Sequence, residues 1–126
     1  MPNPRTVEAF MATVEAGDYV GAIERFYTPD ASMRENMAAP RIGRDALAEH
    51  ERGVMAQFAA ITARRQGPPM ISPDGVAIHW RFEFHLHHGG SRALEEVAWQ
   101  TWRGEAIAEE TFFYDPAQMA VEMPAE

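Results

Sequence analysis

The stretch Val76-Ala-Ile-His-Trp-Arg-Phe-Glu-Phe-His-Leu-His87 decides the fold of this chain. Apolar side chains occupy every even position of this stretch, whereas the odd positions from His79 onward are all ionisable. Successive side chains of a β-strand point to opposite faces, so this strict alternation predicts one long strand with an apolar face and a polar face. The alternation alone leaves open whether the polar face meets solvent, a partner subunit or a cavity.

Further strands are predicted after this one. Gly89-Gly90 and then the run Leu94-Glu-Glu-Val-Ala-Trp-Gln-Thr-Trp102 follow it, which indicates an antiparallel hairpin. In the second run, Val97 and Trp99 share one face, and Glu96, Gln100 and Trp102 share the other unless a bulge exchanges them. A last strand is predicted over 107–114, and a shorter one over 60–66.

The first half of the chain has the 3.6-residue period of amphipathic helices. Helices are predicted over 5–16, 19–27 and 45–58, and a short extended segment over 31–37. Helices followed by a long antiparallel meander indicate an α+β fold, with the helices packed on one face of a curved sheet. The length of 126 residues predicts a single domain over 1–126.

Composition excludes several classes of function. The net charge is −8 and all eleven basic residues are arginine, which argues against nucleic acid as a partner. Without cysteine, the chain has no disulfide, thiol nucleophile or zinc–cysteine site. We find no apolar run of about 18 residues and no apolar signal-peptide core, so we expect a cytoplasmic protein with no membrane partner.

Five segments resemble the nuclear-transport-factor-2-like superfamily, and within it the SnoaL-like branch. They are Phe26-Tyr-Thr-Pro-Asp30, Met33-Arg-Glu-Asn36, Gly43-Arg-Asp-Ala-Leu47, Glu96-Val-Ala-Trp-Gln-Thr-Trp-Arg103 and Phe112-Phe-Tyr-Asp-Pro116. The resemblance implies a cone-shaped α+β fold, also called cystatin-like, in which three helices pack on a curved, mostly antiparallel sheet. It also implies a homodimer, and a small hydrophobic molecule handled in the cone without a cofactor.

A finer resemblance is to limonene-1,2-epoxide hydrolases. Asn36 is similar to a water-orienting asparagine of that family, and Arg81-x-Glu83 is similar to its Arg-x-Asp pair. These matches imply that Arg81 and Glu83 line the pocket and that Asn36 orients water or ligand. Two positions depart from the family, because Arg34 stands where a tyrosine is expected and Phe112 where a second carboxylate is expected.

Glu110 lies one inward position before Phe112 on the last predicted strand. Glu83 and Glu110 are therefore the candidate acid–base residues, with Arg81 as their electrostatic partner. Burial in an apolar cone raises a carboxyl pKa, which suits proton transfer near neutrality. The competing interpretation is that Glu83 and Arg81 face water or a second subunit, since a strand of this pattern normally buries its apolar face. The residues expected to contact the ligand are Asn36, Trp80, Trp99, Phe112 and Tyr114.

The histidines of the long strand do not indicate a metal site. His85-x-His87 projects two imidazoles to the same side, but a useful site needs a third ligand and the pair lies beside an exposed hairpin. We therefore expect neither metal nor cofactor. The preferred function is an isomerase, cyclase, dehydratase or epoxide-hydrolase type of reaction, and the alternative is a non-catalytic ligand-binding or dimerisation domain.

Overall fold

Three helices and seven strands form the part of the chain that the computed structural model describes, residues 1–124. They are α1 (Pro4–Glu15), α2 (Tyr19–Phe26), β1 (Tyr27–Glu35), β2 (Arg41–Ile42), α3 (Arg44–Ala56), β3 (Ala60–Arg65), β4 (Met70–Ile71), β5 (Gly75–His85), β6 (Ser91–Arg103) and β7 (Ala106–Phe113), followed by the short 3₁₀ helix η1 (Pro116–Ala120). The three predicted helices and the long strands are thus confirmed to within two residues at most of their ends.

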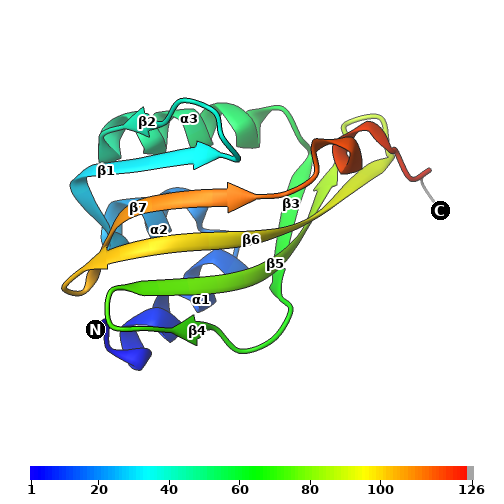
Figure 1. Cartoon of the computed structure of the whole chain (residues 1–126). Helices are drawn as coiled ribbons and strands as arrows, with labels where there is room; N and C mark the ends of the chain where they lie inside the picture. Colours follow the sequence, from blue (N-terminus) through cyan, green and yellow to red (C-terminus); the bar gives the residue numbers. More distant parts are fainter. Residues whose placement is uncertain (125–126) are drawn as a thin grey trace.

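The sheet has the strand order β2-β1-β7-β6-β5-β3, and β4 pairs with the beginning of β5. All neighbouring strands are antiparallel except β1 and β7, which are parallel. Figure 1 shows α1 and α2 behind the curved sheet and α3 along its upper edge, so the helices cover one face. The predicted class, an α+β cone with three helices on a curved and mostly antiparallel sheet, is confirmed.

The strand β5 buries its apolar face, as its alternation requires. Val76, Ile78 and Trp80 are at most 3% exposed and pack in the core, while His79 on the other face is exposed. The hairpin pairs Gly75 with Thr101 at one end and His85 with Ser91 at the other. The apolar face therefore points toward the helices, and the polar face is the outer face of the sheet.

A bulge in β7 sets which of its side chains point inward. Thr101 pairs with Glu109 and Trp102 with Ile107, so one residue of β7, Ala108, has no partner in β6. Because the side-chain period of a strand is two, this extra residue reverses the parity. Ile107 and Glu110 consequently both lie on the buried side, although three positions separate them.

The N-terminal helices close the cone by burying one stripe each. Val7, Phe10, Met11 and Val14 of α1 are buried, and the ring of Phe10 meets the ring of Trp102 edge-on at 6.4 Å. The Asn3 side chain caps α1 by accepting from the Arg5 N–H, and the Asp18 side chain caps α2 by accepting from the Gly21 N–H. No helix in the described part of the chain has the length and apolar character of a membrane span.

Two features of the fold differ from expectation. The second helix ends at Phe26 and β1 begins at Tyr27, four residues before the extended segment that we predicted. The parallel pairing of β1 with β7, for example Met33 with Glu110, was not predicted from the meander pattern. Both differences arise from long-range pairing, which overrides local periodicity.

Candidate functional site

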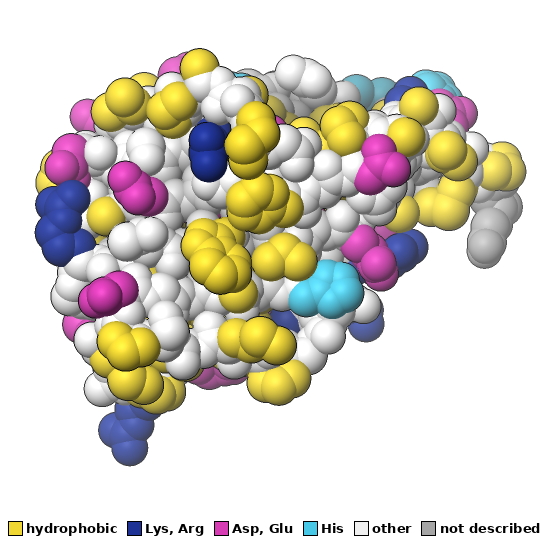
Figure 2. Space-filling view, in the orientation of Figure 1, with side chains coloured by type: hydrophobic (Ala, Val, Ile, Leu, Met, Phe, Trp, Pro, Cys, Tyr) yellow, Lys and Arg dark blue, Asp and Glu magenta, His cyan; other side chains and the backbone are white. Residues whose placement is uncertain are grey.

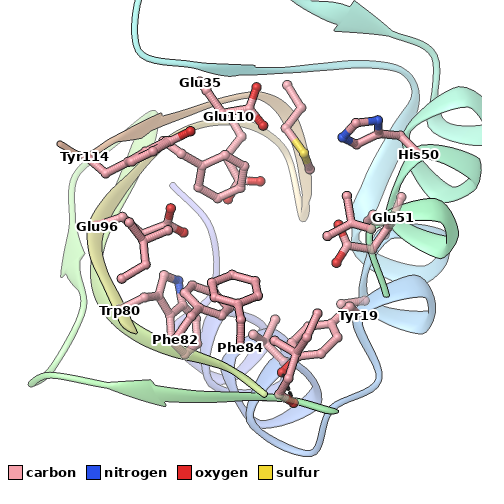
Figure 3. Close-up of a pocket in the computed structure, with 18 of the residues that line it drawn as sticks. Tyr19, Glu35, His50, Glu51, Trp80, Phe82, Phe84, Glu96, Glu110 and Tyr114 are labelled. Atoms are coloured by element: carbon pink, nitrogen blue, oxygen red, sulfur yellow. Dashed lines mark hydrogen bonds between the residues drawn. The ribbon is translucent and has the colours of Figure 1, made fainter. Parts of the chain in front are cut away.

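A cavity of about 340 Å³ lies between the inner face of the sheet and the helices α2 and α3. Its walls are largely apolar and aromatic, and Figure 3 shows Trp80, Phe82 and Phe84 side by side along one wall. Small-molecule sites typically have this form, an apolar hollow with a few placed polar groups. Its polar lining residues are Tyr19, Tyr27, Glu35, Arg41, His50, Glu51, Gln57, Glu96, Glu110 and Tyr114.

Glu110 of β7 is held in place by a buried hydrogen-bond network. The Tyr27 hydroxyl donates to its Oε1, and the Gln100 Nε2 donates to its Oε2 at 2.6 Å. The Trp102 indole Nε1 in turn donates to the Gln100 Oε1 at 3.0 Å, which fixes the orientation of that amide. Glu110 is 3% exposed, and both of its oxygens accept from a neutral donor.

Burial raises the pKa of Glu110 to about 7. The hydrogen bonds from Gln100 and Tyr27 act in the opposite direction, because they favour the ionised carboxylate, and the negative charge of Glu51 adds to the increase. Glu110 therefore changes its protonation state near neutral pH. The same burial raises the pKa of Tyr27 well above its ordinary value, so Tyr27 stays a hydrogen-bond donor.

A second buried carboxyl group, that of Glu96 on β6, projects into the cavity. Glu96 is 7% exposed and pairs across the hairpin with Trp80. Burial, together with the negative charges of Glu110, Glu35 and Glu51, raises its pKa to about 8, and no side chain within residues 1–124 donates a hydrogen bond to it. Figure 3 shows its carboxyl group directed toward the cavity interior.

The helix α3 and the strands β1 and β2 supply the remaining charged groups. Arg41 donates two hydrogen bonds to Glu35, at 2.8 and 3.1 Å, which lower the pKa of that carboxyl. His50 and Glu51 lie one after the other on α3, and burial raises the pKa of Glu51. Figure 3 places Glu51 on the side of the cavity opposite Glu96.

Two further tyrosines lie in the cavity wall. The Tyr19 hydroxyl donates to the Ile61 carbonyl at 2.9 Å, and burial raises the pKa of Tyr19 to about 12. Burial also raises the pKa of Tyr114, whose hydroxyl points into the cavity in Figure 3. Tyr114 therefore lies in the cavity wall, and its contact with a ligand stays a prediction.

Of the residues proposed from the sequence, four line the cavity: Trp80, Glu110, Phe112 and Tyr114. Arg81 and Glu83 do not, and the expectation that they face the pocket is wrong. Their side chains lie on the outer face of β5, are 37% and 41% exposed, and approach each other to 3.6 Å. The physical reason is that the even-numbered side chains of β5 are the apolar ones, and burying them turns the odd ones outward.

Asn36 and Trp99 also lie outside the cavity. Asn36 has a φ of 49°, and its side-chain oxygen accepts from the Tyr114 N–H at 3.0 Å, so it joins the ends of β1 and β7. It therefore holds the backbone of Tyr114, not water or ligand directly. Trp99 lies on the outer face of β6, opposite Ala77, and is 60% exposed.

Sequence reasoning missed Tyr27, Gln100 and Glu96 as site residues. Two of them had a usable signal, because the register of the hairpin pairs Glu96 with Trp80 and Gln100 with Val76. Paired side chains share a face, so the apolar parity of β5 places both polar residues inside. Tyr27 gave no such signal, since the apolar pattern of α2 includes it although it begins β1.

The described residues do not offer a site for a metal ion. Within residues 1–124, no group of three or more His, Asp or Glu side chains is arranged to hold one. His85 lies on the outer face, where its Nε2 is 3.9 Å from a carboxylate oxygen of Glu83.

Comparisons with known proteins agree with this fold. A putatively assigned polyketide cyclase of the SnoaL-like type from Mesorhizobium loti has 22% sequence identity and a TM-score of 0.73, with 90% of this chain and 100% of that chain covered. A hypothetical protein with a ketosteroid isomerase-like fold from Catenulispora acidiphila, crystallised in complex with trimethylamine, has 18% identity and a TM-score of 0.77, covering 94% and 95%. A nuclear-transport-factor-2-like protein of unknown function from Burkholderia pseudomallei has 16% identity and a TM-score of 0.79, covering 94% and 95%.

No curated protein matches the sequence. At these identities the solved structures establish the fold and not the activity. The model of the SnoaL-like domain, however, matches residues 7–110, which run from the first turn of α1 to Glu110 within β7. The chain therefore belongs to the SnoaL-like domain family.

Proposed function

We propose that this protein binds a small, mostly apolar molecule in the cavity and transfers a proton on it without a cofactor, with Glu110 as the general base. One observation carries the proposal: Glu110 is a buried carboxyl in the wall of an apolar cavity, oriented by Tyr27 and Gln100. A base is most effective when its pKa is near the working pH, and that of Glu110 is about 7.

The orientation of Glu110 supports its role as a base. Each carboxylate oxygen can accept two hydrogen bonds, so the donors Tyr27 and Gln100 leave lone pairs available for a substrate proton. When Glu110 takes up that proton, the two donors favour its return, because they stabilise the ionised form. Glu110 is thus built to accept a proton and then release it.

Glu96 supplies the complementary acid. Its pKa of about 8 keeps it protonated at pH 7, where Glu110 is about half ionised. Two carboxyl groups with different protonation states in one cavity form an acid–base pair. Isomerisation, cyclisation and dehydration all need such a pair, whereas the hydrolase assignment loses its support once Arg81 and Glu83 lie on the outer face.

The test is deprotonation of 5-nitrobenzisoxazole, a flat apolar molecule whose loss of a carbon-bound proton opens the ring to a coloured phenolate. It reports a base in an apolar cavity whatever the natural substrate is. We expect the wild-type protein to accelerate the reaction and Glu110→Gln to lower kcat by roughly 10²–10⁴-fold, the usual contribution of a general base. Glu83→Gln, on the outer face, is the matched control and leaves the rate unchanged.

The second candidate is a non-catalytic ligand-binding domain. The observation that favours it is that the Glu110 network joins β1, β6 and β7, which gives this carboxyl a structural role in the sheet. In that case Glu110→Gln leaves both the binding of an apolar dye and the deprotonation rate of 5-nitrobenzisoxazole unchanged, while Trp80→Ala weakens the binding of the dye. A wild-type rate no higher than that of the buffer would decide for this candidate.

We also propose that two copies associate through the outer face of the sheet. Trp99, Val97 and Phe113 are 60%, 38% and 39% exposed there, and Val97 pairs with Phe113 across β6 and β7. Figure 2, which looks onto this face, shows hydrophobic side chains across its centre with few charged groups between them. Large exposed apolar side chains grouped on one face are typical of a protein interface.

A further inference from the structure

We propose that the ligand of this cavity is a hydrophobic cation, an ammonium group with apolar substituents, and that Glu96 is its charge partner. This inference rests on the proposed binding function of the same cavity and names the chemical class that the cavity selects. A bound cation ionises Glu96, so with such a ligand Glu96 is the charge partner and not the acid. It is carried by the balance of charged groups in the lining, by the unpartnered carboxyl of Glu96 and by the aromatic walls around it.

The lining of the cavity has an excess of acidic groups. Four carboxyl groups, those of Glu35, Glu51, Glu96 and Glu110, face Arg41 and His50. The guanidinium of Arg41 is engaged by Glu35 through two hydrogen bonds, so these two charges offset each other. The remaining carboxyl groups would repel an anionic ligand to the extent that they are ionised, whereas a bound cation is attracted to the ionised form and favours it.

Glu96 is the most deeply buried carboxyl of this lining that no side chain of residues 1–124 pairs with; Glu51, which is less buried, also has no such partner, and the Nε of Arg41 is unpaired as well. Glu96 is more than nine-tenths buried, its carboxyl points into the cavity, and no side chain of the described region donates a hydrogen bond to it. The carboxyl oxygens of Glu96 are not among the sealed, unpaired atoms of residues 1–124, so they open onto the cavity, and a group in the cavity is the partner available to them. A cation seated in the cavity would provide the partner that the protein itself does not.

Aromatic rings line the cavity wall that begins beside Glu96. Trp80 pairs with Glu96 across the hairpin, and its ring lies 6.0 Å from the ring of Phe82, which in turn stacks on Phe84 at 6.2 Å. The face of an aromatic ring attracts a cation, and the attraction grows when both are removed from water. Trp80, Phe82 and Phe84 therefore suit the apolar substituents of an ammonium ion as well as its charge.

The protonation state of Glu96 gives the inference a distinctive signature. The ionisable groups that share the cavity with it are Glu110 on β7, Tyr27 and Glu35 on β1, Arg41 on β2, His50 and Glu51 on α3, Tyr19 on α2 and Tyr114 after β7. With its pKa at about 8, Glu96 is mostly protonated at pH 7, and a bound cation favours the ionised form. Binding at pH 7 is therefore expected to release a proton, and the apparent affinity is expected to rise between pH 6 and pH 9.

The experiment compares two probes of nearly equal shape by calorimetry: benzyltrimethylammonium, which has a permanent charge, and 2,2-dimethylpropylbenzene, its neutral isostere. We expect the cation to bind wild-type protein at least tenfold more tightly than the isostere at pH 7. Titrations in buffers of different ionisation enthalpy are expected to show proton release. Glu96→Gln is expected to remove the tenfold preference and the proton release, while the affinity for the isostere stays the same.

Glu95→Gln is the matched control, since Glu95 is the neighbouring carboxyl and is exposed on the outer face. Equal affinity for the two probes, or a wild-type affinity for the cation that does not change with pH, overturns the inference without relying on any variant. The rate with 5-nitrobenzisoxazole separates the two proposals. If the deprotonation rate depends on Glu110 but the protein does not prefer the cationic probe, only the inference about the charge of the ligand is wrong. If the protein neither prefers the cation nor accelerates deprotonation, the proposed catalytic function of the cavity is wrong as well.

Discussion

Trp80 and Glu96 are direct cross-strand partners on the inner face of the sheet, one from each strand of the β5–β6 hairpin. The pair places a fully buried indole beside a carboxyl group that is itself buried and without a hydrogen bond from any side chain in residues 1–124. Sheets normally reserve such central positions for apolar pairs. An acidic group at this position is costly for stability, which is typical of residues retained for function.

The Tyr27→Phe variant tests the hydrogen-bond network of Glu110. The Tyr27 hydroxyl lowers the pKa of Glu110 relative to burial alone, so removing it is expected to raise that pKa further above 7. The lost hydrogen bond to a charged group is expected to lower the free energy of unfolding by about 1.5–3 kcal/mol at pH 8. Carboxyl-carbon NMR titration measures the first effect, and chemical denaturation measures the second.

Tyr19→Phe serves as the control for this change. This substitution also removes a hydroxyl from the cavity wall, but the Tyr19 hydroxyl donates its hydrogen bond to the Ile61 carbonyl and not to Glu110. The titration of Glu110 is therefore expected to stay the same in this variant. If Tyr27→Phe left the pKa of Glu110 unchanged or lowered it, the proposed network would be incorrect.

The dependence of stability on pH follows from Glu96 and Glu110. Burial raises both pKa values, to about 8 and about 7, above the ordinary value of 4.5. A carboxyl whose pKa is higher in the folded state binds its proton more tightly there, so its stabilising effect is complete below the unfolded pKa and is lost as pH rises. The free energy of unfolding is therefore expected to fall between about pH 4.5 and pH 8, by at most about 1.4 kcal/mol per pH unit for each group.

Glu96→Gln isolates the contribution of one group. The amide cannot ionise, so the variant is expected to be more stable than the wild-type protein at pH 8 and to show a shallower fall in stability with pH. Denaturant titrations at pH 5, 6, 7 and 8 measure both. A variant that follows the wild-type curve in parallel would show that Glu96 is ionised in the folded protein at neutral pH.

The fold was predictable from the sequence because its main signals are local. The alternation of the long strand, the Gly89-Gly90 turn and the helical stripes each depend on neighbouring residues, and the elements that they predict are present. The parallel pairing of β1 with β7 joins segments far apart in the chain. No local pattern specifies such a pairing, and it was missed.

The site was only partly predictable, for a related reason. Glu110, Phe112 and Tyr114 were placed correctly because the resemblance gave their parity, which the bulge in β7 produces. Arg81 and Glu83 were misplaced because that resemblance was followed against the apolar alternation of their own strand. Where a motif of a few residues conflicts with the burial pattern of a whole strand, the burial pattern involves far more free energy.

Glu83→Gln, which removes a charge from the outer face, is expected to have little effect. Arg81 and Glu83 form an exposed ion pair at 3.6 Å, and such pairs contribute at most about 1 kcal/mol. We expect the midpoint of denaturation, the binding of the cationic probe and the deprotonation rate all to remain close to wild type. A large loss of rate would restore Glu83 as a catalytic candidate and would require this face to form part of an active site.

Trp99→Glu tests whether the outer face joins two copies of the chain. Trp99 is 60% exposed with Val97 beside it on the same strand face, and a buried negative charge at the centre of such an interface would be strongly unfavourable. We expect the wild-type protein to sediment as a dimer and the variant as a monomer. The cavity lies on the other face of the sheet, so the monomeric variant is expected to bind the probe as tightly as the dimeric wild-type protein does.

The control is Met70→Glu, which places the same charge at an exposed apolar residue of the peripheral strand β4 and is expected to leave the dimer intact. A wild-type protein that sediments as a monomer at micromolar concentration would mean that the exposed indole has a different partner or none.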